Sequence, residues 1–421
     1  MHAEPRPPTD SSLSNAAPWP ACGAYADGFR TVAERFAARL ASGEEIGAGL
    51  AVFLRGRQVV DLYGGLADVE RGTPWRHDTR LVVFSVTKGF AAMALNLLSE
   101  RGRLDWDAPV EAYWPGFGRN GKEGMTLRTL FGHRGGLAYL DDKLLLEECF
   151  ERTPRLIEAL EAQRPFSPTR QAYHAITYGL YAREVFERVA GERMGAFLRR
   201  ELFEPLGSDV HLGAPPALDD RVAALYPPET GARVARSLAA AILRPASTEA
   251  RLARDVLTRA SLARRAFANP TNGARGLLAY NDVPARRAEL PWASATASAL
   301  GVARAYLPYS VGGVVEGRRL VGAETIDALS RRDGWSDRDA VLQKPLGWNR
   351  GFLKEQAGVF GPSREAFGHP GMGGALGWCD PRAGLAIGYV MNRMDWRVRS
   401  PRAVALCGEI YACEPVRDER T

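Results

Sequence analysis

Apolar side chains follow two periods along this 421-residue chain, one typical of helices and the other of strands. Residues 21–42 predict an amphipathic helix, because their apolar side chains lie three or four positions apart. These side chains are Tyr25, Phe29, Val32, Phe36 and Leu40. The next two segments, 46–56 and 57–68, are rich in strand-forming residues and predict an antiparallel hairpin that turns around Gly56. A sheet is therefore expected to begin near residue 47.

A second helical pattern begins at Ser85 and ends at Arg101. Its apolar face is formed by Phe90, Ala94, Leu97 and Leu98. Gly102 follows at the position where a helix C-cap belongs, since glycine adopts the left-handed conformation that ends many helices. Ser85 is thus expected to stand at the N-terminus of a helix.

Helical patterns broken by Gly and Pro fill residues 111–285. After residue 290 the chain returns to a helix, then to strand-like runs such as GLAIGYVMNRM, and ends in a helix near 401–412. The simplest architecture is an α/β (α+β) domain built from residues 21–110 and 286–421, with residues 111–285 inserted as a helical lobe. The polar, Pro-rich residues 1–20 are expected to form an N-terminal arm.

Composition and charge narrow the class of protein. A chain with 46% hydrophobic and 25% charged residues can bury a large core without disulfides or metals. No stretch approaches the roughly 20 apolar residues of a membrane span, and the first residues lack the pattern of a secretory signal, so we expect no membrane partner and a cytoplasmic location. The net charge of +6 is spread along the chain, which disfavours a nucleic-acid partner. The five cysteines and six histidines lack metal-ligand spacing, so neither a metal nor a cofactor is expected.

The sequence Ser85-Val86-Thr87-Lys88 contains the one lysine that has a serine three positions before it. Residues i and i+3 share a helix face, so the Lys88 amine is expected to reach the Ser85 hydroxyl. Burial of a lysine favours the neutral amine, which can accept a proton. The backbone N–H of Ser85, at the helix N-terminus, is expected to stabilise an oxyanion. The alternative is that Ser85 only caps the helix and that Lys88 is a solvated side chain.

The sequence around this motif resembles the superfamily of class C β-lactamases and related carboxylesterases, in which an S-x-x-K motif carries the nucleophile. FSVTKGFAAMALNLLSERGRLDWDAPVEAYWPGF is similar to the serine helix and the G-x-L-x-L-D-x-P-V segment after it, here Gly102 to Val110. MTLRTLFGHRGGLAYLDD is similar to the His-x-x-Gly-Leu turn, here His133 to Leu137. The resemblance implies a β-lactamase-like fold with a central antiparallel sheet, and Ser85 as a nucleophile activated by Lys88.

The second motif of this superfamily, Tyr-x-Asn, corresponds to Tyr173-His174-Ala175. The resemblance implies that Tyr173 is a second catalytic base, and a phenol beside the Lys88 ammonium is expected to have a lowered pKa. Ala175 stands where β-lactamases carry an Asn that contacts the amide side chain of their substrate, which argues against β-lactams. His174 is expected to be structural, because neighbouring side chains of an extended segment point to opposite sides.

The third motif, Lys-Thr-Gly in β-lactamases, is replaced by His369-Pro370-Gly371 in a context that resembles the esterase branch, the family VIII carboxylesterases. Gly371 is expected to leave room for the acyl group, and the N–H of Met372 to be the second oxyanion donor. His369 removes a permanent cation, so uncharged acyl substrates are favoured. Trp348 and Trp378 are candidates for the acyl pocket or for the core.

These observations favour a serine carboxylesterase that cleaves small-molecule esters through an acyl-enzyme on Ser85. Acyl transfer to an alcohol or amine stays open, because the motifs do not reveal the acceptor. A β-lactamase or D-Ala-D-Ala peptidase is disfavoured by Ala175 and His369. A non-catalytic binding protein on the same fold would be expected to lose Ser85, Lys88 or Tyr173. The sequence does not indicate an oligomeric state.

Overall fold

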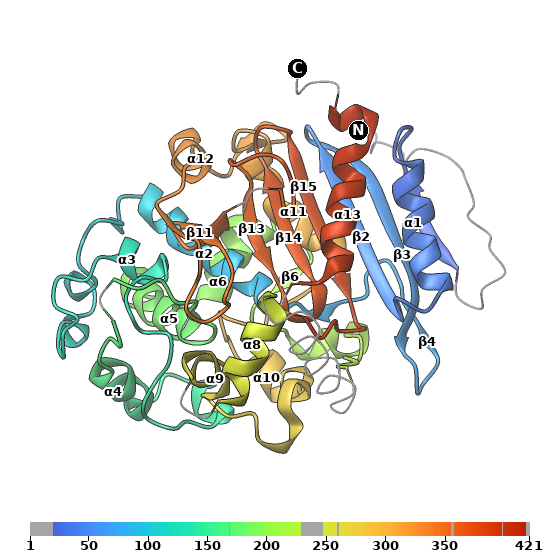
Figure 1. Cartoon of the computed structure of the whole chain (residues 1–421). Helices are drawn as coiled ribbons and strands as arrows, with labels where there is room; N and C mark the ends of the chain where they lie inside the picture. Colours follow the sequence, from blue (N-terminus) through green and yellow to red (C-terminus); the bar gives the residue numbers. More distant parts are fainter. Residues whose placement is uncertain are drawn as a thin grey trace.

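A ten-stranded antiparallel sheet runs through the molecule, and strands from both ends of the chain lie side by side in it (Figure 1). The computed structural model describes residues 20–417 except 168, 229–246, 259–260, 355–357 and 398. The strands follow one another across the sheet in the order β1 (Ala21–Tyr25), β3 (Arg57–Asp68), β2 (Gly47–Leu54), β15 (Leu385–Met391), β14 (Leu376–Asp380), β13 (Phe367–Pro370), β12 (Phe352–Lys354), β11 (Leu346–Asn349) and β10 (Gly334–Ser336), with β4 (Thr73–Pro74) paired to β3. The mixed α/β fold with a large antiparallel sheet confirms the predicted fold class.

The pairing of β2 with β15 joins the two ends of the sequence. All eight residues of β2 are buried, because helices cover both faces of the sheet at its centre. The predicted hairpin of β2 and β3 is confirmed, and its turn uses Arg55 and Gly56 with φ of +49° and +84°. Two left-handed residues suit the twist of a tight hairpin.

Helices cover both faces of the sheet. On one face lie α1 (Arg30–Ala41) and α13 (Pro401–Ala412), which share a core with alternate residues of the central strands (Figure 1). On the other face lie α11 (Ala299–Ser310) and α2 (Val86–Glu100), which join the larger core. This second face carries the chemistry described below.

The predicted helix over residues 21–42 is wrong in its first third. Residues 21–25 form the edge strand β1, which pairs with β3, and the helix begins only at Arg30. Gly23 has φ of +114°, and a Cβ there would lie 1.9 Å from the Asp61 carbonyl oxygen, so this segment is fitted to its neighbour in the sheet. Strand pairing thus outweighs a helical spacing that included Tyr25.

Helices dominate the middle of the chain. They are α3 (Leu127–Phe131), α4 (Pro154–Ala162), α5 (Thr177–Ala190), α6 (Met194–Leu198), α8 (Thr248–Leu257), α9 (Leu262–Ala268) and α10 (Val283–Arg287). A short sheet of β5 (Leu81–Val82), β7 (Thr296–Ala297) and β6 (Val210–His211) connects this region to the segment before Ser85. The division into domains at residues 110 and 285 stays a prediction, and the predicted arm of residues 1–20 lies outside the described residues except for Pro20.

Helix α2 runs through the interior between the sheet and α5. Thirteen consecutive residues, Val86 to Leu98, are buried, so the helix is enclosed on all sides. Gly102 has φ of +67°, as expected of a residue that ends a helix. Among the described residues, no helix is long and apolar enough to cross a membrane.

Candidate active site

Ser85 stands at the N-cap of α2, on a backbone that turns sharply just before it. Phe84 has φ of +46°, a left-handed conformation that is rare for an aromatic residue and is typical of functional sites. The Ser85 side chain makes no capping hydrogen bond to its helix. Its Oγ instead accepts hydrogen bonds from Lys88 Nζ and Tyr173 Oη, each at 3.1 Å. A simple helix-cap role for the Ser85 hydroxyl is therefore excluded.

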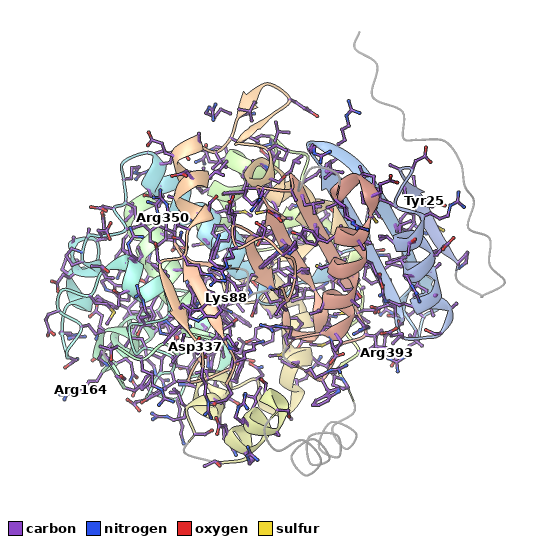
Figure 2. The ribbon with its side chains drawn as sticks, turned by 45° about the horizontal axis from the view of Figure 1, so that its top comes forward. Tyr25, Lys88, Arg164, Asp337, Arg350 and Arg393 are labelled. Atoms are coloured by element: carbon purple, nitrogen blue, oxygen red, sulfur yellow. The ribbon has the colours of Figure 1, made fainter. Side chains whose placement is uncertain are left out.

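Lys88 is fully buried one turn into α2, in the interior shown in Figure 2. Besides Ser85, its ammonium donates to the carbonyl oxygen of Trp292 at 3.2 Å, and it lies 5.2 Å from the centre of the Tyr173 ring. Burial away from water lowers the pKa of Lys88 well below its ordinary value. A buried lysine is therefore more often in its neutral amine form than a solvated lysine is. The alternative that Lys88 is a solvated side chain is excluded.

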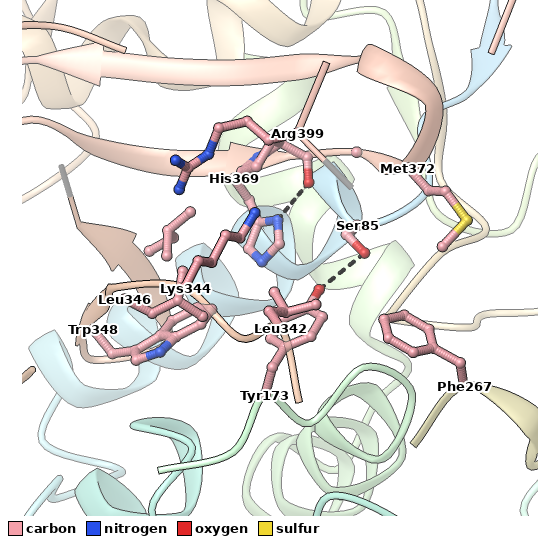
Figure 3. Close-up of a pocket in the computed structure, with 13 residues that line it drawn as sticks. Ser85, Tyr173, Phe267, Leu342, Lys344, Leu346, Trp348, His369, Met372 and Arg399 are labelled. Carbon is pink, nitrogen blue, oxygen red and sulfur yellow. Dashed lines mark hydrogen bonds between the residues drawn. The ribbon is translucent and has the colours of Figure 1, made fainter. Parts of the chain in front are cut away.

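Tyr173 lies in the extended segment before α5, with its hydroxyl directed at Ser85 (Figure 3). The expected lowering of its pKa is wrong. Burial raises the pKa of Tyr173, the hydrogen bond with Ser85 lowers it by less, and the negative charge of Asp339 raises it further. The phenol thus stays protonated at neutral pH and is a proton donor to the oxygen of Ser85.

Two buried side chains that the sequence argument did not assign to the site hold the Tyr173 segment. The Asp339 carboxylate oxygen Oδ1 accepts the backbone N–H of Tyr173 at 3.1 Å and those of Val341 and Leu342 at 2.9 Å. His133, which belongs to the His-x-x-Gly-Leu turn, accepts the N–H of His174 at its Nδ1 at 2.8 Å. Asp339 therefore links Tyr173 to the loop that forms one wall of the pocket.

Strand β13 and the turn after it face Ser85 across the site. His369 donates from Nδ1 to the Pro370 carbonyl oxygen at 2.7 Å, which leaves Nε2 as the acceptor nitrogen of a neutral ring (Figure 3). Burial, with the charge of Lys88 next in size, lowers the pKa of His369 to about 3. In the described part of the chain, no acceptor binds the backbone N–H of Ser85 or that of Met372. Both amides are thus available to a ligand at the mouth of the site.

Gly371 has no room for a side chain beside the segment that precedes α2. A Cβ at this residue would lie 2.4 Å from the carbonyl oxygen of Val83, two residues before Ser85. The missing side chain lets the turn after β13 approach Val83, just before α2, and the expected room for an acyl group at Gly371 stays a prediction. The residue still lines the pocket through its backbone.

A pocket of about 520 Å³, including space open to solvent, lies directly over Ser85. Trp348 lines it and packs parallel to Tyr173, with ring centres 5.9 Å apart and planes 13° apart. Trp378 does not line it. Side chains of β14 alternate across the sheet, so Trp378 faces the core under α13 and contacts Phe360 there.

Several lining residues come from positions that the motifs did not indicate. Phe267 reaches the pocket from α9, Lys344 from the loop before β11, and Arg399 from the segment before α13. Lys344 and Arg399 are basic residues, so the loss of the motif lysine at His369 does not leave the pocket lining without cationic residues. Lys344 stands four residues before Trp348, and that proximity was the available signal in the sequence.

The two neighbours of Tyr173 in its motif lie outside the pocket lining. His174 is fully buried, and burial lowers its pKa to about 3, so it packs as a neutral ring. Ala175 is also buried. Within the described ranges, no group of three His, Cys, Asp or Glu side chains is arranged to hold a metal ion.

Comparison with known proteins identifies the family of this chain. The family model named Beta-lactamase matches residues 32–406. The chain is 35% identical over 376 residues to "Esterase/beta-lactamase LipL" of Mycobacterium tuberculosis, which covers 87% of this chain and 81% of that protein. A crystal structure of a family VIII carboxylesterase superposes with a TM-score of 0.81 at 32% identity, covering 93% of this chain and 99% of the other. EstA from Arthrobacter nitroguajacolicus superposes with a TM-score of 0.78 at 29% identity, covering 94% and 99%. The chain therefore belongs to the β-lactamase family, and within that superfamily it falls in the esterase branch.

Proposed function

We propose that this protein is a serine carboxylesterase that forms an acyl-enzyme on Ser85. The observation that carries the proposal is the contact of one hydroxyl oxygen with both Lys88 and Tyr173, each at 3.1 Å, at the base of an open pocket. A serine hydroxyl is a weak nucleophile until a neighbouring base removes its proton. The names of its esterase relatives support the same reaction class.

Acylation begins when the neutral amine of Lys88 accepts the proton of Ser85, along the contact that joins the two side chains. The Ser85 oxygen attacks the ester carbonyl, and the carbonyl oxygen becomes an oxyanion. The N–H groups of Ser85 and Met372 are proposed to donate to this oxyanion, because two amide donors fixed in advance stabilise developing charge without reorganisation.

Loss of the alcohol requires a proton at the leaving oxygen. Tyr173 is proposed to supply it, because its raised pKa keeps the phenol protonated and its hydroxyl lies beside the reacting oxygen. The Lys88 ammonium then returns a proton to Tyr173. In deacylation, water attacks the acyl carbonyl and gives a proton to this same pair. The bond between the acyl carbon and the Ser85 oxygen then breaks, the pair returns the proton to that oxygen, and the carboxylic acid leaves.

Hydrolysis of p-nitrophenyl butyrate by the purified protein tests the proposal. The wild-type chain is expected to release p-nitrophenol with turnover, and Ser85→Ala, which removes only the reacting oxygen, is expected to lose it while keeping the same unfolding temperature. A folded Ser85→Ala variant that retained more than a few per cent of the activity would contradict the assignment of the nucleophile.

A second candidate activity is β-lactam hydrolysis. It is favoured by Lys344 and Arg399 in the pocket, since β-lactam antibiotics carry a carboxylate, and by the name of the LipL relative. Ala175 does not decide between the two activities, because it is buried and lies outside the pocket lining. Nitrocefin measured beside p-nitrophenyl butyrate separates the two activities.

A further inference from the structure

The turn that carries the Met372 amide is closed by its own backbone. Residues 371–375 connect β13 to β14, and the N–H of Gly371 donates to the carbonyl oxygen of Ala375 at 2.6 Å. The N–H of Gly374 donates to the carbonyl oxygen of Gly371 at 3.2 Å. That carbonyl and the N–H of Met372 belong to one peptide unit, and in a planar trans peptide they point in opposite directions. The hydrogen bond from Gly374 therefore fixes the direction of the Met372 N–H.

A second peptide unit extends this arrangement away from the pocket. The carbonyl of Gly373 shares its peptide unit with the N–H of Gly374. Its oxygen accepts the backbone N–H of Asp395 at 2.8 Å and lies 3.5 Å from Nη2 of Arg402, a longer contact. Hydrogen bonds of one direction thus run from Asp395 and Arg402 through two peptide units, and the Met372 N–H stands at their end.

Arg402 is a buried cation in the first turn of α13, on the face of the sheet opposite to α2 (Figure 1). Its Nη1 donates to Oε2 of Glu45 at 2.5 Å and to the carbonyl oxygen of Glu44 at 3.0 Å. Glu45 is itself buried, and its other carboxylate oxygen accepts the hydroxyl of Tyr389. One nitrogen of the guanidinium is therefore fixed by Glu45, which leaves Nη2 directed at the turn.

A cation at the start of such a chain strengthens the donor at its end. Hydrogen bonds in series polarise one another, and bonds to a charged donor are stronger than neutral ones. The guanidinium draws electron density from the Gly373 carbonyl, so the N–H of Gly374 becomes a better donor to Gly371. The same effect in the next peptide unit makes the Met372 N–H a better donor to an anion.

We propose that Arg402 is a positioning residue for the oxyanion site, which fixes and polarises the Met372 N–H through these two peptide units. This proposal rests on the proposed ester hydrolysis at Ser85, in which Met372 donates to the oxyanion. Arg402 does not line the pocket and acts only through the turn. The sequence gap of thirty residues between Met372 and Arg402 is closed by the fold.

The test compares p-nitrophenyl butyrate with its thionoester, in which sulfur replaces only the carbonyl oxygen. Sulfur accepts hydrogen bonds more weakly than oxygen does. The ratio of kcat/KM for the oxygen ester to kcat/KM for the thionoester, divided by the same ratio for hydroxide, therefore measures how well the N–H donors bind the developing anion. The wild-type enzyme is expected to prefer the oxygen ester more strongly than hydroxide does.

Three variants assign this preference to Arg402. Arg402→Met removes the charge and the donors, and is expected to lower the oxygen-to-sulfur ratio at least about tenfold. Arg402→Lys keeps the charge but loses the two-nitrogen fork, and is expected to lower the ratio about threefold. The control is Lys122→Met, which removes another buried cation that donates to backbone carbonyls, those of Glu161 and Gln163 at 2.6 and 2.7 Å. It is expected to lower the unfolding temperature and to leave the ratio unchanged.

A wild-type ratio in a folded Arg402→Met variant would overturn the positioning role. If that variant does not fold, a wild-type ratio in Arg402→Lys would do so. An equal fall of the ratio in Lys122→Met would also overturn it, because general destabilisation would then explain the change.

The outcome for the wild type separates this proposal from the esterase itself. A wild-type ratio no greater than that of hydroxide would overturn the role of Arg402, whereas turnover of p-nitrophenyl butyrate that is lost in Ser85→Ala would still support the esterase. Absence of p-nitrophenyl butyrate turnover by the wild type would count against both.

Discussion

Replacing Lys88 by Met and Tyr173 by Phe, singly and together, tests whether the two side chains act as one proton-transfer unit. Each donates to the same Ser85 oxygen at 3.1 Å, so removal of either one interrupts a shared route. General acid–base catalysis contributes about 10²–10⁴-fold, so each single variant is expected to lose about 3–5 kcal/mol of transition-state stabilisation. If the two side chains act as a unit, the double variant loses no more than about tenfold beyond the worse single variant.

The fold is expected to survive the Tyr173→Phe substitution. Phe at position 173 keeps the ring that packs on Trp348 with centres 5.9 Å apart, and Ser85 keeps Lys88 as a partner. Loss of the one hydroxyl is therefore expected to cost about 1 kcal/mol of unfolding free energy. The assay is the single-turnover release of p-nitrophenol from p-nitrophenyl butyrate, with Ser85→Ala as the background. A double variant whose loss equals the product of the two single losses would refute the shared unit and indicate independent roles.

Four further outcomes are expected. First, kcat/KM for p-nitrophenyl butyrate exceeds that for nitrocefin by at least about a hundredfold, or about 2.7 kcal/mol, and equal values in parallel absorbance assays would favour the β-lactamase activity instead. Second, Asp339→Ala leaves three buried N–H groups without an acceptor. Urea unfolding should therefore show a loss of at least about 2 kcal/mol of stability, and kcat should fall about tenfold or more. Asp339→Asn still offers Oδ1 as an acceptor and should keep most of the stability and most of kcat. Third, the pKa of Lys88 is lower in the folded protein than in the unfolded chain, so wild-type stability rises with pH between these two pKa values. Thermal unfolding should therefore show that any stability advantage of Lys88→Met over the wild type shrinks from pH 6 towards pH 10. Fourth, Gly371→Ala must displace the carbonyl oxygen of Val83, which would lie 2.4 Å from the new Cβ. The variant should therefore lose about 1–3 kcal/mol of stability, seen as a lower Tm in calorimetry, and should turn over esters more slowly. An unchanged Tm would contradict this role of the glycine.

The sequence was sufficient for features that depend on local spacing or on a family motif. The spacing of Ser85 and Lys88 predicts their contact because it depends only on helix geometry, and the structure contains it. The resemblance around Gly102 and His133 predicts the family, which the comparisons confirm. The catalytic roles of the individual residues stay predictions.

Features that depend on burial and on distant segments could not be predicted in this way. The pKa of Tyr173 is raised because the ring is enclosed, and enclosure is not visible in a tyrosine motif. Trp378 faces the core rather than the pocket, one of the two alternatives left open, because the pairing of β14 with its neighbours in the sheet sets which side chains point to each face. Lys344, Arg399 and Asp339 come from segments with no motif of their own, and only the fold brings them to Ser85 and Tyr173.

The central claim is that the Ser85 oxygen is the reacting nucleophile of this pocket. The most direct measurement is intact-protein mass spectrometry after treatment with a fluorophosphonate probe, followed by peptide mapping. The account predicts one probe per chain, attached to Ser85, and no labelling of the Ser85→Ala variant. Labelling at another residue, or an unlabelled wild-type protein that still hydrolyses p-nitrophenyl butyrate, would contradict it.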